Sequence, residues 1–194
     1  IGLMINGRDN VTFSGCHMDG YLDGLVINDS TNVTGTLTTF TGIFRYGTYL
    51  WGSRDILLTQ FDLRGFEPIF PNPDQTGFKL AYTNYTNVTY SNISSIEGVG
   101  YGVSMVEQDC NNNVIYENNF TGITANVINL YGSDTVIENN FIGNGLVDGI
   151  YISGSNIDVL NNTFFPPFFN CVYTTGATNV TIKQNSIDAC LFRA

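Results

Sequence analysis

The feature that most constrains the fold of this chain is a repeat with a period of 22 to 25 residues, interrupted by one insertion. Each repeat opens with a short apolar segment that usually follows glycine, as in "GLMI" at Gly2 and "GIYI" at Gly149. A second segment begins with Asn or Asp, as in "NVTF" at Asn10, and a third begins near residues such as Phe120. Short apolar runs favour strands over helices. Repeats of this size bury their apolar faces by stacking, so the sequence predicts a solenoid of about eight coils with three short strands per coil.

Paired asparagines recur beside aromatic residues, as in "YENNF" at Tyr116 and "IENNF" at Ile137. In a parallel solenoid each strand pairs with its copy in the next coil, about 4.8 Å away, so equivalent residues form columns. Stacked amides can hydrogen-bond along a column and satisfy the polar groups of a buried turn. We therefore predict an asparagine ladder at the bend between the second and third strands, made of two columns: Asn118, Asn139, Asn161 and Gln184, and Asn119, Asn140, Asn162 and Asn185.

These glycine, N-V-T and N-N-x-F elements resemble the right-handed parallel β-helix of the pectin-lyase-like superfamily, including NosD-like repeat proteins and viral tailspikes. The resemblance covers essentially all of residues 1–194. It implies an all-β, single-domain right-handed parallel β-helix, and it implies no particular chemistry, because these elements build a scaffold. Neither end carries the polar cap that a solenoid needs, so we expect the domain to belong to a longer chain, a larger assembly or a homo-oligomer.

The charge balance and the cysteines restrict the partners. The chain has 17 acidic and 7 basic residues, for a net charge of −10. Nucleic acids and anionic membranes require clustered Lys and Arg, so neither is an expected partner, and no stretch is long enough to span a bilayer. Four cysteines without a CxxC spacing and a single histidine argue against a zinc site. We therefore expect no metal held by Cys and His.

Two cysteines, Cys171 and Cys190, take the same position in adjacent repeats. This arrangement is compatible with a disulfide, which would suit an oxidising, extracellular location. Two stacked free thiols in the core would explain the pattern equally well.

Two sets of polar residues are candidates for modification or ion binding. Nine N-x-S/T sequons occur, and the predicted turn positions Asn10, Asn32, Asn87 and Asn179 are the favoured glycosylation sites. Glu117 and Glu138 are expected to stack in consecutive coils. Such a pair can attract Ca²⁺. The simpler interpretation is that the two glutamates are solvated and point away from each other.

The outward column of the first strands is predicted to read Met4, Val26, Tyr49, Lys79, Ser104, Ile128, Tyr151 and Tyr173. Tyrosine rings in a row can stack on sugar faces while their hydroxyls bond sugar hydroxyls. Tyr49, Lys79, Tyr151 and Tyr173 are therefore the candidate ligand-binding residues. The alternative is that tyrosine simply suits an exposed strand.

Candidates for catalysis are Glu67, Asp74 and Lys79 on and after the long insertion, and Glu107 and Asp109 one coil later. Paired carboxylates can cleave glycosides, and a lysine can act as the base of a lyase. The chain does not match the N-T-D, D-D, G-H-G and R-I-K signatures of polygalacturonases, nor the calcium-aspartate and arginine pattern of pectate lyases.

Three functions fit these observations. The first is a non-catalytic module on a cell or virion surface, or otherwise extracellular, that presents an aromatic face to a glycan or a protein. The second is a polysaccharide lyase or glycoside hydrolase acting on a surface cleft. The third is a structural spacer in a filament or spike, and whether the chain is an enzyme is left open.

Overall fold

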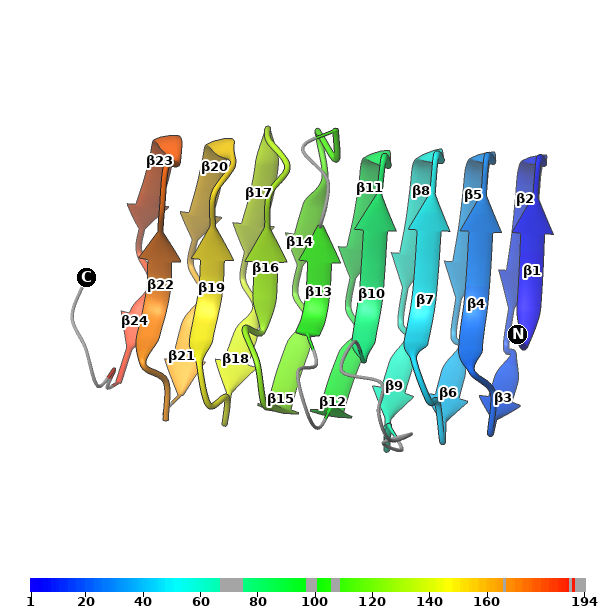
Figure 1. Cartoon of the computed structure of the whole chain (residues 1–194), viewed down its shortest axis with the longest axis horizontal. Helices are drawn as coiled ribbons and strands as arrows, with labels where there is room; N and C mark the ends of the chain where they lie inside the picture. The colour runs from blue at the N-terminus through cyan, green and yellow to red at the C-terminus, as the bar shows by residue number, and fades with distance from the viewer. Residues whose placement is uncertain (67–74, 97–100, 106–108, 166, 189, 191–194) are drawn as a thin grey trace.

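The computed structural model is a rod of stacked coils in which every strand runs parallel to its neighbours. It describes residues 1–66, 75–96, 101–105, 109–165, 167–188 and 190. Each sheet contains eight strands, and the first and last strands of each sheet lie at opposite ends of the rod (Figure 1). Coil 1 comprises β1 (Leu3–Asn6), β2 (Asp9–Ser14) and β3 (His17–Asp19), and coil 8 comprises β22 (Asn170–Thr174), β23 (Thr178–Lys183) and β24 (Ser186–Ile187). The predicted class, an all-β parallel solenoid with three strands per coil, is confirmed.

The first sheet contains β1 (Leu3–Asn6), β4 (Asp23–Asn28), β7 (Tyr46–Trp51), β10 (Thr76–Ala81), β13 (Tyr101–Met105), β16 (Ile128–Leu130), β19 (Asp148–Ile152) and β22 (Asn170–Thr174). The second sheet contains β2 (Asp9–Ser14), β5 (Thr31–Thr36), β8 (Arg54–Thr59), β11 (Asn84–Thr89), β14 (Val114–Tyr116), β17 (Thr135–Glu138), β20 (Ser155–Leu160) and β23 (Thr178–Lys183). The third sheet contains β3 (His17–Asp19), β6 (Thr39–Thr41), β9 (Asp62–Arg64), β12 (Asn92–Ile96), β15 (Asn119–Ile123), β18 (Phe141–Gly143), β21 (Thr163–Phe165) and β24 (Ser186–Ile187). Among the residues described here, no helix is long and apolar enough to cross a membrane.

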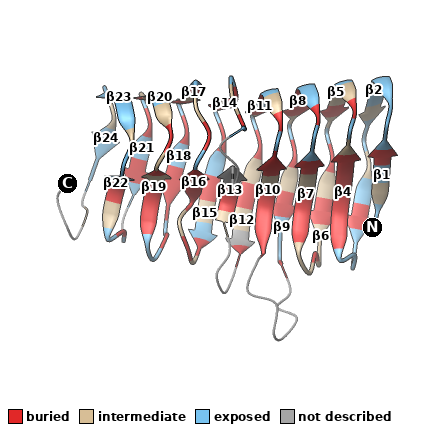
Figure 2. Cartoon of the chain, turned by 45° about the horizontal axis from the view of Figure 1, so that its top comes forward, coloured by how far each residue is buried: buried red, intermediate tan, exposed pale blue. Residues whose placement is uncertain are grey.

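The core runs along the axis of the rod, inside the three sheets (Figure 2). Side chains alternate between the inside and the outside along each strand, as the pleat of a strand requires. In β20, for example, Ile157 and Val159 are buried, while Asp158 and Leu160 between and after them are partly exposed. Parallel register then stacks each inward residue on its copy in the next coil, so Ile137 faces Val159. A continuous apolar core results from this stacking.

The glycine that opens most repeats allows adjacent coils to approach closely. A Cβ atom added to Gly47 would lie 2.7 Å from the carbonyl oxygen of Gly77 and 3.0 Å from the side chain of Leu63. Both distances are too short for a methyl group, so a side chain at this position would force the coils apart. Val127 takes the corresponding place in coil 6, where its carbonyl accepts a hydrogen bond from Gly102.

The asparagine ladder is present, with one column of different membership from the one predicted. Side-chain amides bond in sequence, with Nδ2 of Asn118 to Oδ1 of Asn140 at 3.1 Å, Asn140 to Asn162 at 3.0 Å and Asn162 to Asn185 at 3.1 Å. Each acceptor oxygen also binds the backbone N–H of the preceding asparagine in the ladder. Asn119 was wrongly assigned to this column.

Register explains the error. Inward Ile115 pairs with Ile137 and inward Phe120 pairs with Ile142, which places Asn119 opposite Phe141 on the outside of the third sheet. Burial of the apolar residues fixes the register between the coils. In that register the N-N pair of one coil is shifted by one residue relative to the N-N pair of the next. The predicted column that began with Asn118 is also wrong at its first member, where Glu117 takes the place of Asn118. The residues with left-handed backbone at this bend are Glu117, Asn139, Asn161 and Gln184.

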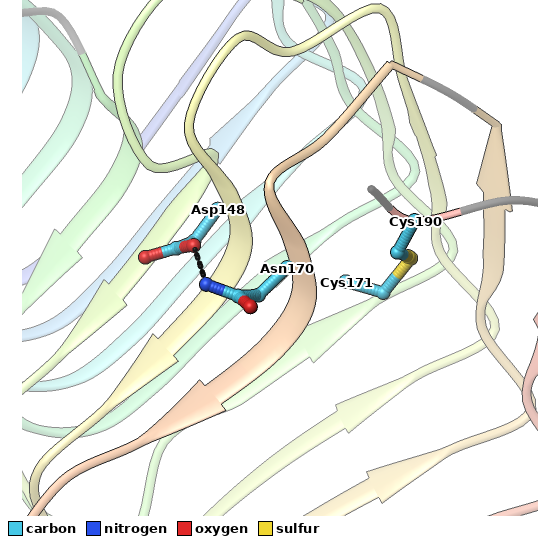
Figure 3. The surroundings of a disulfide bond; sticks show 4 residues. All are labelled: Asp148, Asn170, Cys171 and Cys190. Atoms are coloured by element: carbon cyan, nitrogen blue, oxygen red, sulfur yellow. Dashed lines mark hydrogen bonds between the residues drawn. A yellow bond between two sulfur atoms is a disulfide. The ribbon is translucent and has the colours of Figure 1, made fainter. Parts of the chain in front are cut away.

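A disulfide joins Cys171 at the start of β22 to Cys190 beyond β24, and their Cα atoms lie 5.8 Å apart (Figure 3). Of the two alternatives that the sequence left open, the disulfide is therefore the one observed. Next to it, Nδ2 of Asn170 donates a 2.7 Å hydrogen bond to Oδ1 of Asp148 in the preceding coil. The bond closes coil 8 onto the chain that follows it.

Removing this disulfide is expected to loosen the last coil. Closing a loop of this size typically stabilises a fold by about 2 to 4 kcal/mol, so the double variant Cys171→Ser, Cys190→Ser should exchange the amide protons of β22 and β23 much faster. Hydrogen exchange read by mass spectrometry measures this. Coils 2 to 4 serve as the internal control, because they have no contact with the bond, and equal protection of β22 in both proteins would contradict the expectation.

Candidate binding face

The outward column of the first sheet contains Met4, Val26, Tyr49, Lys79, Asn129, Tyr151 and Tyr173, and the backbone of Ser104 pairs with Lys79 and Asn129 between them. One member of the prediction is wrong, because Asn129 takes the place assigned to Ile128. Ile128 is buried and pairs with Val103 and Ile150. The prediction aligned Asn126 with the glycines, whereas Val127 holds that position, and the following residues shift by one.

Four aromatic rings lie together on coils 3 and 4, and we call them the N-terminal aromatic cluster: Tyr46, Tyr49, Trp51 and Tyr82. The ring centroids are 5.3 Å apart between Tyr46 and Tyr49, 6.4 Å between Tyr49 and Trp51, and 4.7 Å between Trp51 and Tyr82. Trp51 and Tyr82 are each 40% exposed. The sequence prediction included only Tyr49, although Trp51 follows it by two residues and therefore shares its face.

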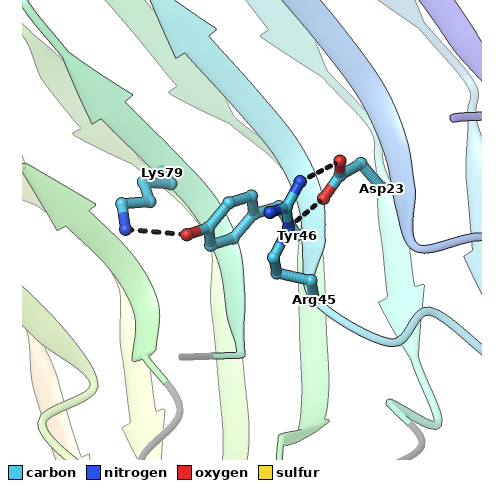
Figure 4. Close-up of polar contacts among 4 residues, drawn as sticks. All are labelled: Asp23, Arg45, Tyr46 and Lys79. Atoms are coloured by element: carbon cyan, nitrogen blue, oxygen red, sulfur yellow. Dashed lines mark hydrogen bonds and ion pairs between the residues drawn. The ribbon is translucent and has the colours of Figure 1, made fainter. Parts of the chain in front are cut away.

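Two cations border this cluster at Tyr46 (Figure 4). Nζ of Lys79 donates a 2.9 Å hydrogen bond to the phenol oxygen of Tyr46, and it lies 4.7 Å from the centroid of that ring. The guanidinium of Arg45 also lies 4.7 Å from this centroid, and its Nε donates a 2.8 Å hydrogen bond to the buried carboxylate of Asp23. The cations are thus held in place by a buried acid and by an aromatic face.

A second group, the C-terminal tyrosine cluster, comprises Tyr131, Tyr151 and Tyr173 on coils 6 to 8. The centroid of Tyr151 lies 5.8 Å from that of Tyr131 and 5.7 Å from that of Tyr173. Partial burial is the main cause that raises the pKa of Tyr151 above its ordinary value, and the nearby phenol of Tyr131 raises it further. Tyr151 therefore stays a neutral hydrogen-bond donor throughout the physiological range.

Coil 4 carries a further group of tyrosines, in a strained backbone conformation. Tyr82, Tyr85 and Tyr90 have φ values of 53°, 53° and 51°, in the left-handed region. At the positions of Tyr82 and Tyr85 the left-handed residues of the other coils are Gly, Asn or Asp, which adopt this conformation at lower cost. The position of Tyr90 is less restricted and also takes Leu37, Gln60, Glu117 and Gln184. All three tyrosine side chains are at least 40% exposed, so burial does not account for the choice.

The proposed catalytic residues do not form a described group. Glu67, Asp74 and Glu107 lie outside the described residues. Lys79 lies on β10 and is bonded to Tyr46, whereas exposed Asp109 lies between the first and second sheets in coil 5. Within the described part of the chain, no three His, Cys, Asp or Glu side chains are close enough to hold a metal ion.

The other predicted polar sites occupy two kinds of position. Asn10, Asn32 and Asn179 are exposed residues with left-handed backbone at the second positions of β2, β5 and β23, rather than in the predicted turns. Asn87 is exposed but lies within β11, paired with Leu57 and Val114, so its assignment to a turn is wrong. Glycosylation at any of the four stays a prediction.

Glu117 and Glu138 fall in adjacent columns rather than in one, which corrects the predicted stack. Glu138 pairs with Tyr116 in the preceding coil and with Leu160 in the next. Glu117 instead belongs to the left-handed bend column that contains Asn139. Calcium binding near these residues is untested and stays a prediction.

A family model described as "Right handed beta helix region" matches residues 1–164, and the chain belongs to this family. No curated protein matches the chain. A crystal structure of a double mutant of the periplasmic alginate epimerase AlgG superposes with a TM-score of 0.73 at 12% identity. The match covers 94% of this chain and 48% of the epimerase, so the chain spans about half of that protein.

Two further structures are similar. A single mutant of the same epimerase gives a TM-score of 0.67 at 9% identity, covering 86% of this chain and 48% of the other. The surface protein and adhesin PfbA of Streptococcus pneumoniae gives a TM-score of 0.46 at 11% identity, covering 94% of this chain and 76% of that one. At these identities the likeness to the epimerase establishes the fold alone.

Proposed function

We propose that this domain is a non-catalytic extracellular module whose first sheet binds a glycan. The observation that carries the proposal is the N-terminal aromatic cluster, four adjoining rings in which Trp51 and Tyr82 are exposed and Tyr46 is buried beside Lys79, which is bonded to it. Aromatic faces give sugar rings a flat apolar surface, and phenol and ammonium groups bond sugar hydroxyls. A protein partner that inserts side chains among the rings is the alternative occupant.

The strained tyrosines of coil 4 support this proposal. A bulky residue in the left-handed region costs about 1 to 2 kcal/mol relative to a right-handed conformation, and Asn or Gly would lower that cost. Tyr82 bears the cost and packs its exposed ring on Trp51. The fold does not require the backbone strain at Tyr82, because Asn or Gly would fit there at lower cost. This strain is therefore a reason to infer a function for the Tyr82 side chain.

A polysaccharide lyase or glycoside hydrolase is the second candidate. The pair formed by Lys79 Nζ and the Tyr46 phenol at 2.9 Å favours it, because a lysine next to a phenol can transfer protons to and from a substrate. A structural spacer would need neither binding nor turnover.

We infer an extracellular or cell-surface location, with a virion surface as a variant of it. The disulfide between Cys171 and Cys190 supports this, because the cytosol of most organisms keeps thiols reduced.

Titration with soluble oligosaccharides tests the proposed function. Trp51 is the only tryptophan, so its emission reports on the N-terminal aromatic cluster. Cellohexaose, chitohexaose and a mannuronate hexamer serve as probes, and at least one should shift the emission saturably. Tyr49→Ala should then raise Kd about tenfold, since one ring contact contributes about 1.4 kcal/mol.

The controls separate binding from stability and from catalysis. Tyr82→Asn and Tyr90→Asn both relieve left-handed strain and both lose one ring contact, so both should keep the thermal midpoint of the wild type within a few degrees. Tyr82→Asn should weaken binding by calorimetry and Tyr90→Asn should not, because Tyr90 pairs with Tyr116 instead. If none of the probes binds saturably, the proposal is refuted. If the wild type releases oligosaccharide products and Lys79→Met does not, the domain is a polysaccharide-cleaving enzyme instead of a non-catalytic module.

A further inference from the structure

The bends between the first and second sheets differ in length along the rod. Five residues separate the inward positions that flank this bend in coils 1 to 4, as from Leu50 to Ile56. Four residues separate Leu130 from Thr135 in coil 6 and Ile152 from Ile157 in coil 7, whereas coil 8 returns to five. Coils 6 and 7 therefore have bends one residue shorter than coil 8 and most of the other coils.

The shorter bends leave a depression, which we call the bend hollow, with a volume of about 410 Å³. Asp109 borders it from coil 5 and Thr178 from coil 8, while coils 6 and 7 contribute Tyr131, Ser133, Ser153 and Ser155. Its volume falls within the range of small-ligand pockets, about 300 to 1,000 Å³.

Two glycines bring the coils at the hollow into close backbone contact. A Cβ atom on Gly154 would overlap the carbonyl oxygen of Gly132, and a Cβ atom on Gly132 would overlap that of Cys110. These coils pack backbone against backbone at this point. At Gly154, which lines the hollow, the floor therefore carries no side chain, and backbone and serine groups face a ligand.

The polar groups of the hollow suit hydroxyl groups of a ligand. Oγ of Ser133 and Oγ of Ser155 lie 2.9 Å apart, and the backbone N–H of Ser155 donates to Ser133 Oγ at 3.3 Å. These bonds fix the two serine oxygens and leave acceptor capacity for ligand hydroxyls. Asp109 adds an exposed carboxylate, which accepts strong hydrogen bonds.

An aromatic ring adjoins these polar groups. Tyr131 is 37% exposed and belongs both to the lining of the hollow and to the C-terminal tyrosine cluster through its contact with Tyr151. A sugar ring needs an apolar face and several hydroxyl partners at one place. Tyr131 is the aromatic residue of a mainly polar lining, and the serines and Asp109 are the hydroxyl partners.

The charges restrict the kind of sugar. No Lys or Arg occurs between residues 80 and 182, whereas that stretch contains eight Asp or Glu. Asp109 is the charged residue of the lining. A ligand carboxylate would be repelled there, and a neutral or protonated amine substituent would not.

We propose that the bend hollow binds one non-acidic pyranose ring, of a neutral or an amino sugar, with Tyr131 against the ring face and Ser133, Ser155 and Asp109 at its hydroxyls. The ligand class rests on the proposed glycan-binding function. The site is separate from the N-terminal aromatic cluster, since Trp51 lies three to four coils away, roughly 15 to 20 Å at the spacing of paired strands.

Nuclear magnetic resonance of the whole ¹⁵N-labelled chain tests the proposal. Methyl glucoside, methyl glucosaminide and methyl glucuronide are titrated to tens of millimolar. The amides of Ser133, Gly154 and Ser155 should shift saturably with the first two and not with the third. Asp109→Asn should weaken binding of the glucosaminide at least fivefold, and Ser153→Trp, which fills the hollow, should abolish the shifts.

Asp158→Asn is the matched control, because it removes the same charge from the second sheet, away from the hollow, and should leave Kd unchanged. Equal shifts with the glucuronide, or unchanged binding in both Asp109→Asn and Ser153→Trp, would overturn the proposal. The two proposals fail separately. If the hexamers shift the emission of Trp51 while no glycoside shifts the amide resonances of the hollow, only the proposed sugar site in the hollow is refuted. If the amide resonances of the hollow shift while the emission of Trp51 does not change, binding at the N-terminal aromatic cluster is refuted.

Discussion

Replacement of Asn140 by alanine is expected to lower the free energy of unfolding by about 3 kcal/mol. Asn140 is 1% exposed, and its Nδ2 donates to the carbonyl oxygens of Ile115 and Glu138 as well as to Asn162. Its Oδ1 accepts from both nitrogens of Asn118. Alanine would leave several of these buried groups unpaired, at about 1 to 3 kcal/mol for each. Urea denaturation followed by far-ultraviolet circular dichroism measures the change.

Asn119→Ala is the control for this experiment, because it deletes the same side chain one residue outside the ladder. Asn119 is exposed, and its Nδ2 donates one 3.0 Å hydrogen bond to Asn92. We expect a loss within about 1 kcal/mol, as for exposed polar residues. Equal effects of the two substitutions would show that the register described here is wrong.

Substitution of Gly154 by alanine is expected to destabilise the protein by about 3 kcal/mol or more. The new methyl group would overlap the carbonyl oxygen of Gly132, which belongs to the backbone of the adjacent coil and cannot rotate away. Overpacking of a rigid site costs about 1 to 3 kcal/mol and more where the backbone must move. Thermal and urea denaturation measure the loss, and coils 6 and 7 should lose protection against hydrogen exchange first.

Gly176→Ala provides the comparison in the next coil. Gly176 has a φ of 63°, but a Cβ atom there meets nothing within 4 Å. We expect a cost of about 1 kcal/mol from the left-handed backbone alone. If Gly154→Ala cost no more than Gly176→Ala, the close approach of coils 6 and 7, and with it the floor of the bend hollow, would be disproved.

Much of the fold could be predicted because the repeat fixes two local properties. Alternation of apolar residues decides which side chains face inward, and the glycine at the second position of most first-sheet strands marks where coils touch. Cys171 and Cys190 occupied corresponding positions in the sequence, so their disulfide was one of two open alternatives.

The errors of register share one cause. Asn119 and Ile128 were each placed by aligning repeated letters, whereas Phe120 and Val127 occupy the inward and close-packed positions of their coils. A shift of one residue turns a side chain from one face of a strand to the other. Sequence similarity between coils does not detect such a shift when the bend before it gains or loses a residue.

The candidate sites were predicted less completely than the fold. Tyr49, Tyr151 and Tyr173 were identified as outward residues, and the structure adds Tyr46, Trp51, Tyr82 and Tyr131 around them. Trp51 could have been found from its spacing to Tyr49. Tyr82 and Tyr131 could not, because each lies in a bend whose path depends on the neighbouring coils.

The sequence by itself determined the fold class, the three strands of each coil, the existence of an amide ladder and the acidity of the surface. Each of these follows from residue types and from their local period. Tertiary structure alone decided which asparagine enters the ladder, which rings touch, and that coils 6 and 7 recede to form the bend hollow. These features depend on contacts between coils, where burial of the apolar side chains sets the register and the length of each bend sets how far the chain extends outward.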